Sequence, residues 1–336
     1  MSYSIRKQAV LKVFQTLALA FVLSFGLISS NSALAQGTGT NRPEQGLAIS
    51  PFILERQIDK GQSTSETIEV TNTTDKTLPV DISINDFTAS GDNGQQTFIA
   101  PGEGDQTYAL SKWITITNNP KLVLKPGEKT EVSFTLTAPQ NAEDGGHYGA
   151  IIFSFTPAQS SGSSVAVSQK VAAIILAKTG KAREEGTIAD FKAKDFISQS
   201  APITFQTRFK NTGNVHVKPR GQVVISNMFG KKVGTALVNP NGNNVLPNSE
   251  RVFDSNWDDK FAFGRYTATV ELVYGESGQV VKEKTSFWVI PFKLVGGIAI
   301  ILIILVLILI FGVRRYNRWF MARLMEQSAS KKRSKK

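Results

Sequence analysis

Residues 130–139 read TEVSFTLTAP, in which apolar Val132, Phe134 and Leu136 alternate with polar residues until Pro139. A period of two places successive side chains on opposite faces, so this pattern predicts a β-strand with one buried face. Similar short runs fill residues 46–290, separated by turn residues, among them LAISPFILERQ, SETIEVTNT, YGAIIFSFTP and ITFQTRFKNT. No long segment of helical period interrupts them. The sequence therefore predicts an all-β fold of antiparallel sandwiches.

The strand pattern begins twice, which predicts two tandem Ig-like β-sandwich domains, residues 46–179 and 186–290. The charged segment GKAREEG, residues 180–186, is interpreted as the linker between them. The stretch QSSGSS, residues 159–164, resembles a linker in composition. We interpret it as a hairpin loop inside the first domain, because residues 165–178 are apolar enough to need a sheet.

Three landmarks recur in the same order in both halves, which favours two related domains. Generic turn chemistry recurring by chance is the alternative. The landmarks are Asn72 and Asn211 at the end of a strand, the turns at 124–128 (LKPGE) and 245–250 (VLPNSE), and Tyr148 and Tyr266 near the start of a late strand.

Residues 294–313 read LVGGIAIILIILVLILIFGV and contain no charged residue. Twenty helical residues rise about 30 Å, the thickness of a bilayer's hydrocarbon core, so the stretch predicts one transmembrane helix. The basic tail, residues 314–336, is expected inside the cell, because Lys and Arg concentrate on the cytoplasmic side. The alternative is an apolar helix in an oligomer core. The flanking residues expected at the two membrane interfaces are Trp288, Phe292, Arg314, Arg315, Tyr316, Arg318 and Trp319.

Residues 1–35 have the basic, apolar and small-residue regions of a signal peptide, with cleavage expected between Ala35 and Gln36. An uncleaved signal anchor is the alternative. Residues 36–45 are polar and predict a disordered leader. Of the 38 basic and 27 acidic residues, three basic ones lie in 1–35, and nine basic and one acidic lie in 314–336. Residues 36–313 are therefore balanced at 26 of each, so the net charge gives no support for nucleic-acid binding.

The residues that usually perform catalysis or bind metals are sparse. The chain has no cysteine and two histidines, His147 and His216, in different predicted domains. Neither has a Cys or His partner at ligand spacing, and no phosphate-binding or nucleophile motif occurs. Carboxylate pairs such as Asp81 and Asp86 fit solvated strand edges better than a glycosidase site. We expect no enzyme, no cofactor and no metal site.

Trp113 is the aromatic residue with the clearest alternative roles. If exposed beside Asp86, its indole could stack on a sugar ring, so Trp113 and Asp86 are the candidate ligand-binding residues. A Trp at the start of a strand more often closes the core of a sandwich, and the sequence leaves both readings open. We expect residues 113–116 to begin a strand.

The sequence resembles a known family in a series of short motifs. GLAISP opens the first domain at 46–51, IEVTN follows at 68–72, and NDF follows at 85–87. LKPGE at 124–128 and DGGHYGAII at 144–152 come later. In this order they resemble the N-terminal domain of the WxL-interacting proteins of Gram-positive bacteria, over residues 46–179. The resemblance implies that the first domain binds peptidoglycan and that the second engages partner proteins, including WxL-domain surface proteins.

These features together predict a non-enzymatic adaptor of the bacterial envelope. It would be a single-pass membrane protein with the bulk of the chain on the extracytoplasmic side. Its expected partners are peptidoglycan, cell-surface proteins and membrane lipid, without nucleic acid. The alternatives are a chaperone-like accessory subunit of a secretion or pilus-type complex and, more remotely, a wall hydrolase.

Overall fold

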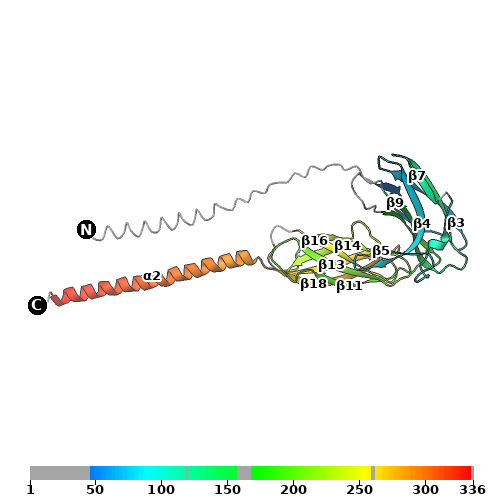
Figure 1. Ribbon diagram of the computed structural model, residues 1–336. Coiled ribbons are helices and arrows are strands. Elements are labelled where there is room, and N and C mark those ends of the chain that lie inside the picture. The colour runs from blue at the N-terminus through cyan, green and yellow to red at the C-terminus, as the bar shows by residue number, and fades with distance from the viewer. Residues whose placement is uncertain (1–45, 118–119, 157–167, 259–261, 334–336) are drawn as a thin grey trace. The chain divides into compact units, whose positions relative to one another are not determined.

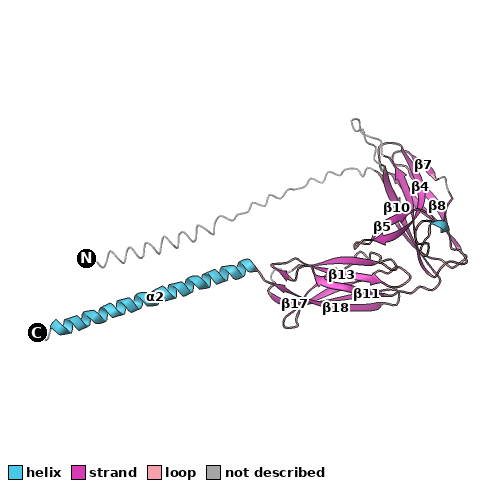
Figure 2. Ribbon diagram, turned by 60° about the horizontal axis from the view of Figure 1, so that its bottom comes forward, coloured by secondary structure: helices cyan, strands magenta, loops and turns pink. Residues whose placement is uncertain are grey.

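A computed structural model (Figure 1) describes residues 46–117, 120–156, 168–258 and 262–333, with side chains up to residue 324. The expected signal peptide, its cleavage between Ala35 and Gln36, the leader and the QSSGSS loop lie outside these residues. Within them the chain forms strands followed by one long helix, as Figure 2 shows by colour. The all-β fold with two tandem Ig-like sandwiches and a C-terminal apolar helix is confirmed.

The first sandwich, residues 46–179, consists of two sheets. Their strand orders are β1-β3-β8-β6 and β2-β10-β9-β4-β5, with β7 also paired to β4. The strands are β1 (Leu47–Ser50), β2 (Ile53–Gln57), β3 (Ser63–Asn72), β4 (Leu78–Ser90), β5 (Gln95–Ile99), β6 (Ile114–Ile116), β7 (Lys121–Leu124), β8 (Lys129–Thr137), β9 (Gly145–Phe155) and β10 (Gln169–Thr179).

The second sandwich, residues 186–290, has the sheet orders β11-β13-β16 and β12-β18-β17-β14-β15. The strands are β11 (Gly186–Ala193), β12 (Ile197–Ser198), β13 (Ile203–Asn211), β14 (Arg220–Asn227), β15 (Lys232–Val238), β16 (Glu250–Trp257), β17 (Gly264–Tyr274) and β18 (Gln279–Val289). No strand lies between Thr179 and Gly186.

Alternating burial explains why these segments are strands. In β8 the side chains of Val132, Phe134 and Leu136 are fully buried, and the intervening residues are more exposed. Each sandwich has its own apolar cluster, one built from Leu47 through Ala177 and the other from Ile188 through Val289. The period-two pattern thus assigns one face of most strands to a core.

The asparagine landmarks are equivalent in structure. The Asn72 amide donates to the Leu124 carbonyl at 2.9 Å, and the Asn211 amide donates to the Val245 carbonyl at 2.8 Å. Both asparagines are fully buried, and each side-chain oxygen accepts a backbone N–H two residues later. Each side chain therefore holds the turn after its own strand to the turn at 124–128 or 245–250.

The tyrosine landmarks are not equivalent, which corrects the sequence interpretation. Tyr266 packs within the core of the second sandwich, whereas Tyr148 belongs to a separate apolar cluster that includes Leu246 of the second sandwich. Ile151, Phe153 and Phe155 of β9 face the first core, so Tyr148 lies on the opposite face of its strand. A shift of one residue in a strand exchanges the two faces, and a motif comparison does not detect it.

Trp113 also departs from the expected strand. Residues Ser111–Trp113 form a short 3₁₀ helix, η1, and the strand β6 begins at Ile114. The carboxylate of Asp86 accepts hydrogen bonds from the backbone N–H groups of Leu110 and Ser111, at 2.7 and 2.6 Å. This acceptor satisfies backbone donors at the start of the turn, which favours the helical conformation over an extended one.

The C-terminal helix α2 spans Phe292–Arg333 and is longer than the expected 294–313. It continues through Arg314, Arg315 and Arg318, because the sequence after Val313 has no proline or glycine that would end it. Within it Tyr316 and Trp319 lie 6.1 Å apart between ring centroids. Residues 292–324 are long and apolar enough to cross a membrane, so α2 is a candidate transmembrane helix.

A candidate binding groove between the sandwiches

The strand β9 is buried on both faces, which is unusual for an antiparallel sandwich. Its second face presents Tyr148, Ala150 and Ile152, which cluster with Phe87 and Leu176 of neighbouring strands. Leu246, from the turn before β16, completes this cluster from the second sandwich. The two sandwiches therefore share an apolar contact, in addition to their separate cores.

Tyr148 connects this contact to His216. The Tyr148 hydroxyl accepts a hydrogen bond from the His216 backbone N–H at 2.8 Å, and its oxygen lies 3.3 Å from Nδ1 of the imidazole. Burial lowers the pKa of His216 to about 4 and raises the pKa of Tyr148 well above its usual value. Both side chains are therefore neutral near pH 7.

Polar contacts surround the apolar one. The carboxylate of Asp92, in the β4–β5 turn, accepts two hydrogen bonds from the Arg208 guanidinium, at 2.7 and 2.9 Å. The Asp92 carbonyl also accepts the Val252 N–H at 2.7 Å. At another point the Asn214 amide donates to the Asp144 carbonyl at 2.9 Å. The contact therefore combines a bidentate ion pair with backbone hydrogen bonds.

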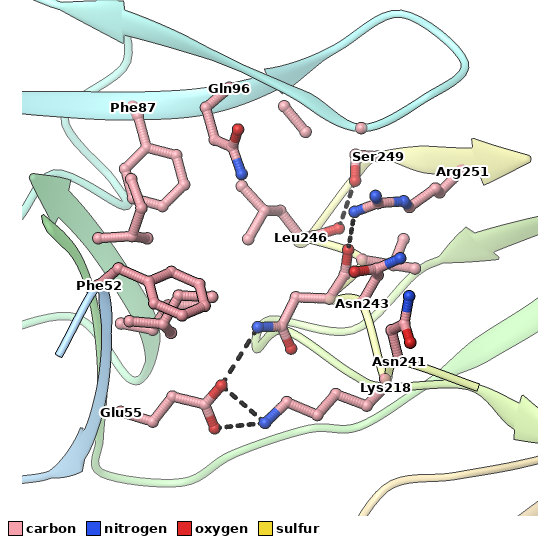
Figure 3. Close-up of a pocket in the computed structure, with 18 of the residues that line it drawn as sticks. Phe52, Glu55, Phe87, Gln96, Lys218, Asn241, Asn243, Leu246, Ser249 and Arg251 are labelled. Carbon is pink, nitrogen blue, oxygen red and sulfur yellow. Dashed lines mark hydrogen bonds and ion pairs between the residues drawn. The ribbon is translucent and has the colours of Figure 1, made fainter. Parts of the chain in front are cut away.

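A groove of about 420 Å³ lies beside this contact (Figure 3). The first sandwich contributes the apolar side chains of Phe52, Phe87 and Leu176, and Leu246 projects toward them from the second. Phe52 is 66 % exposed, so its ring is available at the groove. The polar lining residues are Glu55, Gln96, Lys218, Arg220, Asn241, Asn243, Asn244, Ser249 and Arg251.

An ion pair joins the two sandwiches within the groove. The Glu55 carboxylate accepts hydrogen bonds from the Lys218 ammonium at 2.7 Å and from the Asn244 amide at 3.2 Å. Burial raises the pKa of Glu55, but these two hydrogen bonds and the nearby positive charges outweigh it and hold the pKa below its usual value. Glu55 is therefore an anion at neutral pH.

The other side of the groove is basic. Arg251 donates to the Asn244 carbonyl at 3.0 Å and lies over the ring of Phe253, 5.7 Å from its centroid. Burial lowers the pKa of Arg251, although an arginine stays charged at any physiological pH. The Asn244 side-chain oxygen is buried without a hydrogen-bond partner in the described structure. The half-buried Arg251 and the exposed Arg220, beside the exposed ring of Phe52, form a lining suited to a polar ligand with anionic groups.

The two ligand-binding residues expected from the sequence lie elsewhere in the first sandwich. Trp113 is 7 % exposed, belongs to the core cluster and packs against the His147 ring at 4.2 Å between centroids. Asp86 is 4 % exposed, and its second oxygen accepts the Ser111 hydroxyl at 2.6 Å. Both side chains are used inside the sandwich, and a direct contact of either with a ligand stays a prediction.

His147 has structural partners as well. Its ring nitrogens lie 3.3 Å from the Ala109 carbonyl and 3.0 Å from the Glu143 carbonyl. Burial lowers the pKa of His147. Among the residues that the structure describes, no group of three His, Cys, Asp or Glu side chains could hold a metal ion.

Sequence reasoning missed the groove because its residues carry no motif. Glu55 and Lys218, which form the ion pair in the groove, are 163 residues apart. Lys218 and Arg220 occupy a loop and a strand start without any distinctive spacing. An unusually apolar second face on residues 148–152 was the available signal, since it predicts that something covers that face.

Comparison with known proteins gives one match to a family model. Residues 53–154 match the model described as WxL Interacting Protein, peptidoglycan binding domain. No curated protein matches the chain.

The chain is also similar to solved structures of chaperones. The class 5 fimbriae chaperone CfaA is 14 % identical, with 71 % of this chain and 99 % of that chain covered and a TM-score of 0.39. The E. coli chaperone DraB is 12 % identical, with 72 % and 96 % covered and a TM-score of 0.35. The Pseudomonas aeruginosa CupB2 chaperone is 11 % identical, with 70 % and 97 % covered and a TM-score of 0.33.

Proposed function

Since residues 53–154 match the peptidoglycan-binding domain of the WxL-interacting proteins, we propose that this chain is a non-enzymatic adaptor of the bacterial envelope. The first sandwich binds peptidoglycan without cleaving it. The helix α2 anchors the chain in the cytoplasmic membrane with the basic tail inside. The second sandwich engages cell-surface proteins, WxL-domain proteins among them.

The chemistry of the groove supports binding of a wall polymer. Peptidoglycan offers sugar hydroxyls, amides and peptide carboxylates along one flexible chain. Phe52 supplies an exposed ring, Arg220 and Arg251 supply cations for carboxylates, and Gln96 and Asn243 supply amides. We therefore place the polymer in the groove, with part of its contacts on the matched domain.

The direct test is sedimentation with isolated sacculi. The fragment should be residues 36–290 rather than the first sandwich alone, because removing the second sandwich would expose Tyr148 and Ile152 of β9. We expect this fragment to sediment with the sacculi and to release no soluble muropeptides. If it stays in the supernatant and instead copurifies with membrane subunits, the chaperone-like alternative replaces the adaptor.

Two matched variants test the groove itself. Phe52→Ala removes an exposed ring from the groove and should weaken sedimentation several-fold. Val123→Ala removes a similarly exposed apolar side chain, 69 % exposed, from β7 outside the groove and should have no effect. Equal sedimentation of the two variants would place the polymer on another surface of the first sandwich.

For the partner proteins, we propose the free edge of β15 in the second sandwich. This strand is last in its sheet order, and its outward side chains Val233 and Leu237 are 37 % and 66 % exposed. An edge strand can receive an additional strand from a partner through main-chain hydrogen bonds. Leu237→Lys should reduce binding of a purified WxL-domain protein without changing sacculus binding, whereas unchanged partner binding would reject the β15 edge.

A further inference from the structure

The exposed aromatic side chains of the second sandwich are concentrated at one end. Among its described residues, the aromatic side chains that are more than a third exposed are Phe196, Phe229, Phe263 and Trp288, at 63, 85, 55 and 38 %. We call these four residues the aromatic pole. Soluble surfaces rarely gather several large exposed aromatics, and such a group marks a surface that contacts another phase or molecule.

Strand register shows that the four residues share one end of the sandwich. The backbone N–H of Trp288 donates to the Phe196 carbonyl at 2.9 Å. Gly264, which follows Phe263, pairs with Val289 at the end of β18. The hairpin that carries Phe229 joins the same end, because Asn227 pairs with Tyr266 and the Met228 methyl lies 2.5 Å from where a Gly264 Cβ would be.

The candidate transmembrane helix leaves the sandwich at this same end. The strand β18 finishes at Val289 and α2 begins at Phe292. Three peptide steps span at most about 11 Å. When α2 is in a membrane, the aromatic pole is therefore held within a short distance of the lipid surface, whatever the angle between helix and sandwich.

We propose that the aromatic pole inserts into the outer-leaflet interface of the membrane that holds α2. The amphipathic tryptophan ring favours this depth, and exposed phenylalanine rings supply the apolar area that interfacial surfaces bury at the head-group boundary. The exposed Lys231, Lys232 and Lys293 lie beside the pole and attract anionic head groups. Docking of this kind would hold the second sandwich on the lipid surface and limit the directions in which the first can point.

The short tether favours lipid over a protein partner as the occupant. A partner protein would have to enter a gap that the two-residue connection leaves between the pole and the bilayer, whereas lipid is already there. The inference rests on the proposed membrane anchorage, so the experiment must report the anchorage separately from the docking.

The test uses single-cysteine variants of the full chain, which has no cysteine of its own. Each variant carries an environment-sensitive fluorophore and is reconstituted in nanodiscs containing anionic lipid. Lys231→Cys places the probe at the pole, next to Phe229. Val280→Cys is the matched control on β18, eight residues before Trp288 and therefore about 26 Å away along the strand. Ile303→Cys reports insertion of α2.

Lipids with a nitroxide near the head group serve as quenchers. We expect the Lys231→Cys probe to be blue-shifted and several-fold more quenched than the Val280→Cys probe. Adding Phe196→Ser, Phe229→Ser and Phe263→Ser to Lys231→Cys should abolish both effects, and because all three side chains are exposed the fold should persist, as circular dichroism can verify.

Three other outcomes would overturn the proposal, and the three probes distinguish them. If the Ile303→Cys probe is embedded but the Lys231→Cys probe matches Val280→Cys, the pole does not dock and the anchorage stands. A blue shift without lipid quenching means that protein, such as a second copy of the chain, covers the pole. If the Ile303→Cys probe is not embedded, the anchorage fails and the docking fails with it.

Discussion

Replacing Asn72 by alanine should destabilise the first sandwich by about 3 kcal/mol. The amide donates to the carbonyls of Lys76, Leu124 and Lys125 at 2.8, 2.9 and 3.1 Å, and its oxygen accepts two bonds from Thr74. Lys76 and Lys125 are exposed, so water can replace the amide at their carbonyls. Leu124 is buried, so its carbonyl would stay unpaired at a cost of about 1–3 kcal/mol, added to about 1 kcal/mol for each net hydrogen bond lost.

The assay is urea unfolding of residues 36–290 monitored by tryptophan fluorescence. Trp113 reports unfolding of the first sandwich. Asn72→Asp should cost more than Asn72→Ala, because residue 72 is fully buried and the new carboxylate would face carbonyl oxygens, which repel it. Asn211→Ala should cost as much in the second sandwich, since its amide donates to Val215 and Val245. Asn85→Ala, which loses one bond at 3.1 Å, is the control and should cost about 1 kcal/mol. A loss below about 1 kcal/mol for Asn72→Ala would refute the proposed role of the asparagines.

Three further predictions concern pH, backbone and topology. Burial holds the pKa of His216 at about 4 in the folded chain, below its unfolded value near 6.5. The free energy of unfolding should therefore fall by roughly 3 kcal/mol as the pH drops from 6.5 to 4. In urea titrations, His216→Gln should remove that part of the pH dependence. Gly145 has a φ of 127°, and a Cβ added there would lie 2.4 Å from the Asn214 carbonyl oxygen. Gly127 also has a positive φ but no close neighbour. In thermal unfolding, Gly145→Ala should therefore destabilise the chain by about 2 kcal/mol more than Gly127→Ala. Protease added to wall-stripped cells should leave a short C-terminal fragment protected, and an epitope at Lys336 that antibodies reach from outside would reverse the topology.

The sequence predicted the fold well wherever local patterning determines structure. The alternation of Val132, Phe134 and Leu136 determines which face of β8 is buried, and the uncharged run at 294–313 determines a long apolar helix. The equivalence of Asn72 and Asn211 could be predicted from the sequence, because each side-chain oxygen accepts a hydrogen bond from a backbone N–H only two residues later.

The groove could not be predicted, because its residues meet only through tertiary structure. Glu55 and Lys218 are 163 residues apart, and the sequence contains nothing that pairs them. Tyr148 and Tyr266 do lie near the starts of β9 and β17, but their different faces could not be predicted, because a motif match is insensitive to a one-residue shift in register. The end of α2 at Arg333 could not be predicted, because hydropathy locates the apolar part of a helix and not the point where its backbone hydrogen bonds stop.

Sedimentation of residues 36–290 with purified sacculi tests the central claim, that the first sandwich binds peptidoglycan without cleaving it. The account predicts that the fragment sediments with the sacculi, that excess soluble peptidoglycan fragments release it, and that the supernatant gains no muropeptides over time. A fragment that remains soluble beside the sacculi, or one that releases muropeptides from them, would contradict it.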